Sequence, residues 1–390
     1  MVSELCLGTM LFGDQLNKDQ SFSQLDMAHK KYGINFIDSA ESYPVPSTPN
    51  TCGMSEKIIG DWMSKNKIKR SDIVISTKIC GYSDQITWCR KDNAKTRVNK
   101  KQVIEAVDAQ LKRLKTDHID LLQIHWPDRY IPLYGAPEFM YNLEEEREDI
   151  TPIKEQLEIM NELIKSGKIK HFGLSNETPY GLTSFCNTAE LLSLPKPVTV
   201  QNCYNLLVRN DYENSLQEVC SPKNCNIGLL AYSPLAGGSL TGKYLDPKSV
   251  SVESRMRKYV GFMHRYISTS SLSTIKKYQE VADIFSLPLT QVALAWVYSR
   301  PFVTSTIIGA TSLQQLEDNI LALNIPITEE LTNLINQVYR ANVDPTKGIF
   351  DVIDPNLEYT DPTKLPWGAK DEDVDPELDI IISSRLGGSK

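Results

Sequence analysis

Short runs of β-branched and other apolar residues alternate with longer amphipathic segments along most of this chain, and no other sequence feature limits its folds as strongly. The stretch 101–114 repeats apolar residues at helical spacing, and a second helical stretch, 152–166, begins with Pro152 and is followed by Gly167. Strands that alternate with helices predict βαβ units and a parallel sheet. The strand-like runs lie at residues 4–8, 35–38, 73–78, 119–125, 169–175, 199–204, 227–233 and 304–308.

About eight such units follow one another, which is the number that closes a (β/α)8 barrel. The sequence therefore predicts the α/β class and a TIM barrel over residues 1–340, with long loops on the C-terminal face of its strands. Residues 341–390 contain several prolines and many acidic residues with weak periodicity, so we expect an irregular C-terminal extension there. Such an extension could serve to dock a protein partner.

Two other segments interrupt the alternation. Residues 127–151 follow a strand and include an acidic run at 144–149, so they form either a solvated connection or a loop that faces a substrate. Residues 240–268 are rich in basic and aromatic side chains. Both segments are expected at the edges of the barrel rather than in a separate domain.

Composition excludes several classes of protein. The chain has 390 residues, of which 41% are hydrophobic and 23% charged, as in proteins that fold in water. Its formal net charge of -7 gives no broad attraction to nucleic acid. No apolar run reaches the ~18 residues of a membrane span, and the first residues lack the features of a signal peptide. We therefore expect a cytoplasmic protein without membrane insertion.

The cysteines give no recognisable pattern. There are 8 of them, scattered and without a C-x-x-C pair. Cys220 and Cys225 have no His or Cys pair nearby that could complete a metal site. The sequence predicts reduced structural thiols and no bound metal.

Four polar residues fall at or just beyond the ends of three predicted strands: Asp38, Tyr43, Lys78 and His125. In a barrel of this type these strand ends meet at one mouth, where catalytic groups gather. A phenol such as that of Tyr43 can give a proton to the oxygen of a carbonyl that is being reduced. Its pKa of ~10 calls for a nearby cation, which Lys78 could supply while Asp38 orients it. His125 could hydrogen-bond the carbonyl or share in proton transfer.

Each of these residues has an ordinary structural explanation when taken alone. A lysine at a strand end is usually a solvated charge, and a single histidine is usually a satisfied core or rim residue. Lys78 could also be the Schiff-base lysine of a barrel aldolase. The four residues in matching register favour carbonyl reduction over these alternatives.

Several motifs in order along residues 4–340 resemble the aldo-keto reductase family. They are Leu7-Gly8-Thr9-Met10, Phe36-Ile37-Asp38-Ser39-Ala40-Glu41-Ser42-Tyr43, Ser76-Thr77-Lys78, Ile124-His125-Trp126, Gly173-Leu174-Ser175-Asn176, Val200-Gln201-Asn202, the stretch from Ala231 to Gly238, and Ile308-Gly309-Ala310-Thr311. Within the family, the long loop after His125 and the stretch 238–244 are similar to Tas-like reductases and to potassium channel β subunits. The resemblance implies a (β/α)8 barrel that reduces aldehydes or ketones with NADP(H), with Trp126 beside Tyr43 and His125 in the substrate pocket.

The resemblance also implies a cofactor site, residue by residue. The nicotinamide end would lie near Thr9, Met10, Gln15, Asp38, Ser175, Asn176, Gln201 and Tyr232. The pyrophosphate would lie along Ser233, Pro234, Leu235, Ala236, Gly237, Lys243 and Arg255. The adenosine end would lie near Thr311, Gln315, Asp318 and Asn319, where Thr311 is expected to open a helix whose N-terminus favours phosphate. Ser175, Asn176 and Gln201 are implied to bind the carboxamide, and Tyr232 to stack on the ring.

Two features leave the function open between alternatives. The chain has Gln315 and Asp318 where many reductases carry an arginine for the adenosine phosphate. The channel-β-like subgroup has comparable polar residues there, and for that reason we expect NADP(H) rather than NAD(H). That subgroup also sets a precedent for a second function: an NADPH-binding regulatory or scaffold subunit with slow turnover. Kinetics would separate such a subunit from a working reductase.

Overall fold

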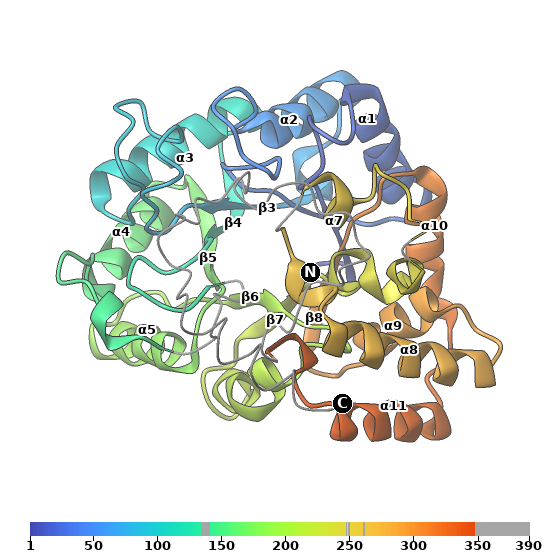
Figure 1. The fold of residues 1–390 in the computed structure, drawn as a ribbon. Coiled ribbons are helices and arrows are strands. Elements are labelled where there is room, and N and C mark those ends of the chain that lie inside the picture. The colour runs from blue at the N-terminus through green and yellow to red at the C-terminus, as the bar shows by residue number, and fades with distance from the viewer. Residues whose placement is uncertain (134–140, 247, 249, 260–261, 348–390) are drawn as a thin grey trace, which may run out of the picture.

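Eight parallel strands form a closed barrel with the helices around it. The computed structural model describes residues 1–133, 141–246, 248, 250–259 and 262–347. Each strand pairs with its neighbours in sequence, and β1 pairs with β8 to close the sheet. Figure 1 shows the strands at the centre and the helices as an outer ring. The predicted (β/α)8 barrel is confirmed.

The strands are short and the helices longer, as the alternation predicted. The strands are β1 Leu5–Gly8, β2 Phe36–Asp38, β3 Val74–Ile79, β4 Ile119–Ile124, β5 Ile169–Ser175, β6 Thr199–Cys203, β7 Gly228–Tyr232 and β8 Val303–Ile308. The α-helices are α1 Lys18–Asp26, α2 Met54–Asn66, α3 Lys100–Leu114, α4 Ile153–Lys165, α5 Pro179–Leu191, α6 Gln217–Cys220, α7 Arg255–Lys258, α8 Thr269–Ile284, α9 Leu289–Tyr298, α10 Leu313–Leu321 and α11 Glu329–Ala341.

The strand ends differ slightly from the sequence expectation. Lys78 is followed by one more strand residue, Ile79, and His125 lies just beyond the end of β4 instead of being its last residue. The helix boundaries follow local signals. The side chain of Asn99 accepts a hydrogen bond from Gln102 N at the start of α3, and Lys115 ends that helix in the left-handed conformation, with φ 54°.

Inward and outward side chains alternate along the strands. Cys6, Phe36, Leu121 and Leu230 form a small apolar cluster separate from the main core, in which the alternate strand residues pack against the helices. The small cluster is therefore the apolar filling of the barrel interior. On three of these strands the next inward position toward the strand end is polar: Asp38, Gln123 and Tyr232 lie two residues beyond Phe36, Leu121 and Leu230. The same periodicity that builds the core thus places polar groups at the mouth.

The irregular segments are partly within the described residues. Residues 127–133 and 141–151 connect β4 to α4 and contain the 3-10 turn Leu143–Glu145. After α11 the chain contacts α8, because Ser271 Oγ donates to Pro345 O at 3.4 Å. The rest of the predicted extension, residues 348–390, lies outside the described residues, and its role as a docking segment stays a prediction.

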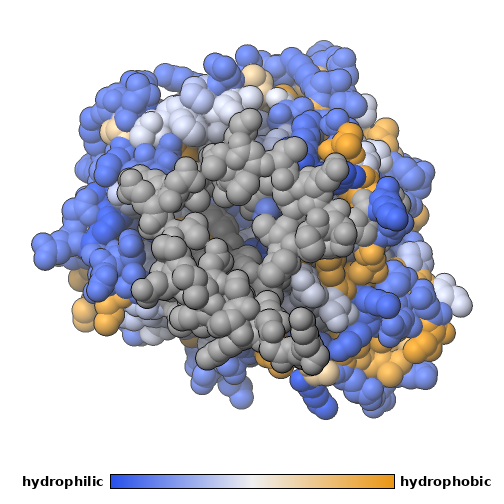
Figure 2. Space-filling view, viewed as in Figure 1, coloured by the Kyte–Doolittle hydropathy of each residue, from blue (hydrophilic) through white to orange (hydrophobic). Residues whose placement is uncertain are grey.

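No single helix among the described residues is long and apolar enough to cross a membrane. Helices α8 and α9 reach the required length and apolarity only together, and they meet at a bend of 92°. Figure 2 shows one face of the molecule, with the described residues coloured by hydropathy. The coloured part of this face is mostly hydrophilic, and its hydrophobic residues gather toward the right-hand side of the view.

Gly60 sets the distance between α2 and α3. A Cβ at this position would lie 2.3 Å from Arg113 O and 2.7 Å from Leu114 C. We expect Gly60→Ala to lower the free energy of unfolding by about 1–3 kcal/mol, because the backbones must separate, although alanine has the higher helix propensity by about 1 kcal/mol. Urea unfolding followed by circular dichroism measures this. Gly309→Ala is the matched control, since its nearest neighbouring atom would be 3.8 Å away; a Gly60→Ala protein as stable as this control would contradict the packing argument.

Candidate functional site

A buried ion pair joins β2 and β3 inside the barrel. Lys78 Nζ donates to Asp38 Oδ2 at 2.5 Å and to Ser39 O at 2.8 Å, and the Lys78 side chain is 0% exposed. The other carboxylate oxygen of Asp38 accepts from Ser76 Oγ at 3.0 Å and from Gln201 Nε2 at 2.9 Å. Both oxygens of this buried carboxylate therefore accept hydrogen bonds, which is what a charge removed from water requires.

Tyr43 lies over this pair on the loop between β2 and α2. Lys78 Nζ is 5.0 Å from the centre of the buried Tyr43 ring, and no hydrogen bond joins the two side chains. Burial, with the charge of Asp38 adding to it, raises the pKa of the Tyr43 phenol well above its usual range. Lys78 does not produce the lowered pKa expected of a cation beside a phenol, because its charge is committed to Asp38. The phenol is fully protonated at neutral pH.

His125 faces Tyr43 from the end of β4. Their rings meet edge to face with centroids 5.6 Å apart. Burial lowers the pKa of the His125 imidazole well below its usual value, and the Lys78 cation acts in the same direction. The imidazole is therefore neutral at physiological pH. Its Nδ1 atom is buried and has no hydrogen-bond partner among the described residues, so the site holds a polar group whose partner would come from a ligand.

The predicted nicotinamide residues come together on β5 to β7. Asn176 Nδ2 donates to His125 O at 2.8 Å, and Tyr232 Oη donates to Asn176 Oδ1 at 2.6 Å. Ser175 Oγ donates to Gln201 O at 2.8 Å. The Gln201 amide nitrogen, expected to bind a carboxamide, already donates to Asp38. These contacts link the predicted nicotinamide residues to the ion pair.

The first loop supplies the remaining residues of this set. Thr9 is buried, and its hydroxyl lies 2.9 Å from Asp38 O and 2.6 Å from Ser55 Oγ. Met10 is half-buried and packs against the main core. Gln15 Nε2 is buried and makes no hydrogen bond of good geometry with the described residues, although the Gln15 side chain interacts with the Tyr259 hydroxyl. A ligand could displace this weak contact, whereas the Thr9 hydroxyl is committed to positioning β2.

Two cations lie together beyond β7 in the predicted pyrophosphate segment. Within the described part of the chain, neither Lys243 nor Arg255 has a carboxylate partner. Partial desolvation and then the charge of Arg255 lower the pKa of Lys243, and desolvation lowers the pKa of Arg255. A Cβ on Gly238 would lie 3.1 Å from Lys243 Nζ, so glycine there leaves room for the ammonium group against the loop. Two adjacent cations without an acid fit a doubly charged anion.

The loop that carries these cations has an unusual backbone. Positive φ angles occur at Ser233 (54°), Ala236 (49°) and Gly237 (64°). Left-handed residues in such a turn orient backbone N–H groups toward anions. Pro234 and Leu235 lie between them, so the whole predicted segment 233–237 is one compact turn after β7.

The predicted adenosine residues lie at the start of α10. Thr311 does not open the helix as expected: Ser312 is its N-cap and the helix begins at Leu313. Thr311 N and Oγ instead donate to Gln315 Oε1 at 3.0 and 2.8 Å. Asn319 is buried and its Nδ2 donates to Gly309 O at 3.3 Å, while Asp318 accepts from a helix neighbour. Asn319 therefore holds the loop before α10 in place.

The arrangement of a closed barrel with these groups at its mouth matches a known family. The sequence pattern of the aldo/keto reductase family matches residues 4–340. The chain belongs to the aldo/keto reductase family. As a member it is an NAD(P)H-dependent oxidoreductase, and its residues fit that cofactor through Gln15, Lys243 and Arg255.

Three relatives of this aldo/keto reductase illustrate its range. It is 39% identical over 284 residues to an aldo-keto reductase of Babesia bovis, covering 71% of this chain and 99% of the relative. It is 36% identical over 345 residues to protein tas of Escherichia coli (strain K12), covering 88% and 96%. It is 31% identical over 327 residues to a probable voltage-gated potassium channel subunit beta of Arabidopsis thaliana, covering 83% and 88%.

Trp126 of this reductase lies beside His125 in one wall of the barrel mouth. Its ring lies 4.8 Å from that of His125, and its Nε1 donates to Tyr82 O at 2.7 Å. A Cβ on Gly81 would lie 1.8 Å from Trp126 O, so only glycine lets the β3–α3 loop come this close. The expected substrate residues Tyr43, His125 and Trp126 are thus contiguous.

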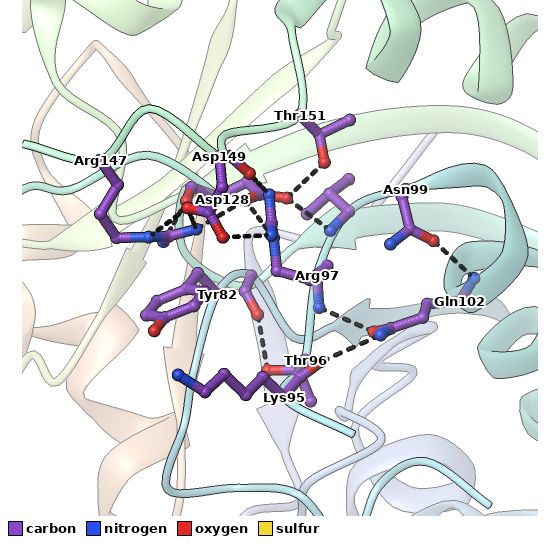
Figure 3. Close-up of polar contacts among 12 residues, drawn as sticks. Tyr82, Lys95, Thr96, Arg97, Asn99, Gln102, Asp128, Arg147, Asp149 and Thr151 are labelled. Carbon is purple, nitrogen blue, oxygen red and sulfur yellow. Dashed lines mark hydrogen bonds and ion pairs between the residues drawn. The ribbon is translucent and has the colours of Figure 1, made fainter. Parts of the chain in front are cut away.

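A polar network that sequence reasoning missed holds the two loops of this wall together. Asp128 accepts from Arg97 Nε at 2.8 Å and from Val98 N at 2.8 Å, and Arg97 also reaches Asp149 (Figure 3). The Arg147 guanidinium lies 3.2 Å from the centre of the Tyr82 ring. Residues 127–133 and 141–151 are therefore tied to the β3–α3 loop. No local pattern signals this, because the partners are far apart in sequence.

Removing half of the buried ion pair should be costly. Asp38→Asn would leave the Lys78 cation buried beside a neutral amide, so we expect the free energy of unfolding to fall by about 3–5 kcal/mol in urea titrations. Asp38→Asn combined with Lys78→Met should recover part of that loss. The control is Glu162→Gln, which removes the exposed partner of Lys100 and should cost at most about 1 kcal/mol. If Asp38→Asn and Glu162→Gln lower the free energy of unfolding equally, the buried pair stabilises the fold no more than an exposed pair does.

Proposed function

We propose that this protein is an NADP(H)-dependent reductase of aldehydes and ketones in which Tyr43 is the general acid. The observation that carries the proposal is the convergence of Tyr43 and His125 over the buried Asp38–Lys78 pair at one mouth of the barrel. A protonated phenol, a neutral imidazole and a fixed cation in one water-poor site suit a reaction in which an oxygen becomes negative.

A nicotinamide cofactor bound at this mouth would supply the hydride for the carbonyl carbon. The residues proposed to hold it are those already named: Asn176 and Tyr232 beside the mouth, Gln15 from the first loop, and Lys243 with Arg255 for the phosphates. Asn176 also holds the backbone carbonyl of His125, so the cofactor side and the substrate side keep a fixed separation. Such fixed positions lower the entropic cost of bringing two reactants together.

The proton goes from Tyr43 Oη to the carbonyl oxygen of the substrate. Because the pKa of Tyr43 is raised, the phenol keeps its proton until negative charge develops on that oxygen. Lys78 offsets the charge of Asp38, which disfavours the phenolate, and the charge of Arg255 favours it. His125, neutral because its pKa is lowered, can donate one N–H to the same oxygen and orient the carbonyl.

The choice of NADP(H) over NAD(H) is part of this proposal. Helix α10 itself contains no lysine or arginine, so an adenosine phosphate would depend on the helix N-terminus and on Thr311 and Gln315. Titration with NADPH and NADH, followed by protein fluorescence, tests the preference. We expect NADPH to bind at least about tenfold more tightly than NADH. Equal affinities would contradict the preference and show that the protein binds either cofactor.

A second function is favoured by two observations. The relatives include a probable potassium channel subunit beta, and the raised pKa of Tyr43 makes the phenol a reluctant donor. These features suit a regulatory subunit that binds NADPH and turns over slowly. Such a subunit would bind the cofactor as tightly as the reductase would, but a carbonyl substrate would oxidise it at a negligible rate.

Tyr43→Phe tests the proton donor. We expect kcat for reduction of 4-nitrobenzaldehyde to fall by at least about 100-fold, because only the acidic hydroxyl is removed, while NADPH affinity stays within about twofold of wild type. Tyr180→Phe is the matched control, since that side chain lies on α5 and is 71% exposed. Unchanged kcat in Tyr43→Phe would remove Tyr43 from the mechanism.

Arg255→Ala tests the anion site. We expect the Kd of NADPH to rise about tenfold or more, since a charge-assisted contact contributes about 1.5–3 kcal/mol, with a smaller change in kcat at saturating cofactor. Lys258→Ala removes the same charge from the same short helix, where Lys258 pairs with exposed Glu253. If both variants weaken binding equally, Arg255 is an ordinary surface charge.

A further inference from the structure

Two cysteines that are far apart in sequence meet at the edge of the barrel mouth. Cys52 lies just before α2, and Cys89 lies in the loop between β3 and α3. Their Sγ atoms are 2.9 Å apart, and both side chains are half-buried. All the cysteines are free thiols in this structure. The pair is therefore placed for a reaction between the two sulfurs.

One buried glutamate holds both thiols in place. Cys52 Sγ donates to Glu41 O at 3.1 Å. The Glu41 carboxylate receives Arg90 Nη1 at 2.8 Å and Nη2 at 3.1 Å, and Arg90 also donates to Cys89 O at 2.9 Å. Glu41 is two residues before Tyr43. The contact between Cys52 and Cys89 therefore depends on the same loop that carries Tyr43, the proposed general acid.

A metal site does not account for the cluster. A third thiol, Cys80, is buried beside Cys89 and shares a hydrogen bond with it. Within the described residues, no group of three or more His, Cys, Asp and Glu side chains could hold a metal ion. Thiol chemistry is the remaining property that distinguishes these side chains.

We propose that Cys52 and Cys89 form a dithiol that a hydroperoxide oxidises to a disulfide, which ties the β3–α3 loop to the start of α2. This modification goes beyond the proposed reductase activity and does not depend on it. The buried Cys80 is not a partner in the bond.

The reaction balances in two steps. One thiolate attacks an oxygen of the hydroperoxide, the O–O bond breaks, and a sulfenic acid forms while the other oxygen takes up a proton from solvent and leaves as an alcohol, or as water in the case of hydrogen peroxide. The second thiol then attacks the sulfenic sulfur, the S–S bond forms, and water leaves. Each sulfur loses one electron overall, and the peroxide gains both.

Hydrogen bonding favours Cys89 as the attacking sulfur. The hydrogen bond with Cys89 and burial raise the pKa of Cys52, so Cys52 keeps its proton. The hydrogen bond from Cys52 lowers the pKa of Cys89, but the contact with Cys80 and burial outweigh it and leave that pKa raised as well. Thiolate is scarce at neutral pH, so the oxidation becomes faster as pH rises.

The disulfide would stiffen the substrate side of the mouth. Trp88, next to Cys89, donates from Nε1 to Ser47 Oγ at 3.0 Å. This is the only direct side-chain hydrogen bond that the tryptophan makes to the loop carrying Tyr43 within the described residues. A disulfide between Cys52 and Cys89 would add a covalent link to this hydrogen bond and to the ion pair of Arg90 with Glu41.

Peptide mapping of the full-length protein tests the assignment. The protein is treated with hydrogen peroxide, free thiols are blocked, and a digest is analysed by mass spectrometry without reduction. We expect a peptide pair linked through Cys52 and Cys89, which dithiothreitol separates. The pair should persist in Cys80→Ser and be absent from Cys52→Ser. A Cys80–Cys89 link, or thiols oxidised further without any link, would overturn the proposal.

The chain contains an internal control and a second readout. Cys186 and Cys225 also share a hydrogen bond, but Cys186 is buried, so their link should form more slowly; if it forms first, the pairing of Cys52 and Cys89 is not special. Hydrogen exchange of residues 81–98 should slow at least threefold in the oxidised wild type. Peroxide-treated Cys52→Ser should show no slowing, and equal exchange in the two proteins would contradict the tether.

Discussion

The ion pair between Asp38 and Lys78 is the interaction on which the rest of the site depends. Both charges lie in the barrel interior, where neither could remain without the other and without further hydrogen bonds. Asp38 gathers donors from β3, β4 and β6, since Gln123 Nε2 also approaches it at 3.3 Å. One carboxylate therefore couples the strand that leads to Tyr43 with the strand that leads to the cofactor residues, and this fixes the shape of the mouth.

The fold could be predicted from the sequence because apolar residues recur with a different period in strands and in helices. Eight successive strand–helix units then leave few alternatives to a closed barrel. Asp38, Lys78 and His125 could be identified for the same reason, since inward strand positions at one end of a barrel converge. The contact between Gln123 and Asp38 could not be predicted from the sequence, because the role of an inward polar residue is recognised only when its partner across the barrel is known. The same holds for Arg97 with Asp128 and for Cys52 with Cys89, whose separation of 37 residues gives no local signal.

The mouth has two sides with different physical character. The cofactor side combines a compact turn after β7 with two cations that lack carboxylate partners in the described part of the chain. The substrate side consists of Trp126 and two loops held by ion pairs and by Glu41 with Arg90. This first side contains the residues that we propose to hold the cofactor of this aldo/keto reductase. The second side also contains the proposed dithiol of Cys52 and Cys89.

The most direct measurement of the central claim uses the wild-type protein in one cuvette. NADPH is titrated in while intrinsic fluorescence is recorded, and 4-nitrobenzaldehyde is then added while cofactor oxidation is followed by absorbance. The account predicts saturable binding followed by steady turnover over many catalytic cycles. Saturable binding with no turnover would contradict the reductase and favour the regulatory subunit, and an absence of binding would contradict both.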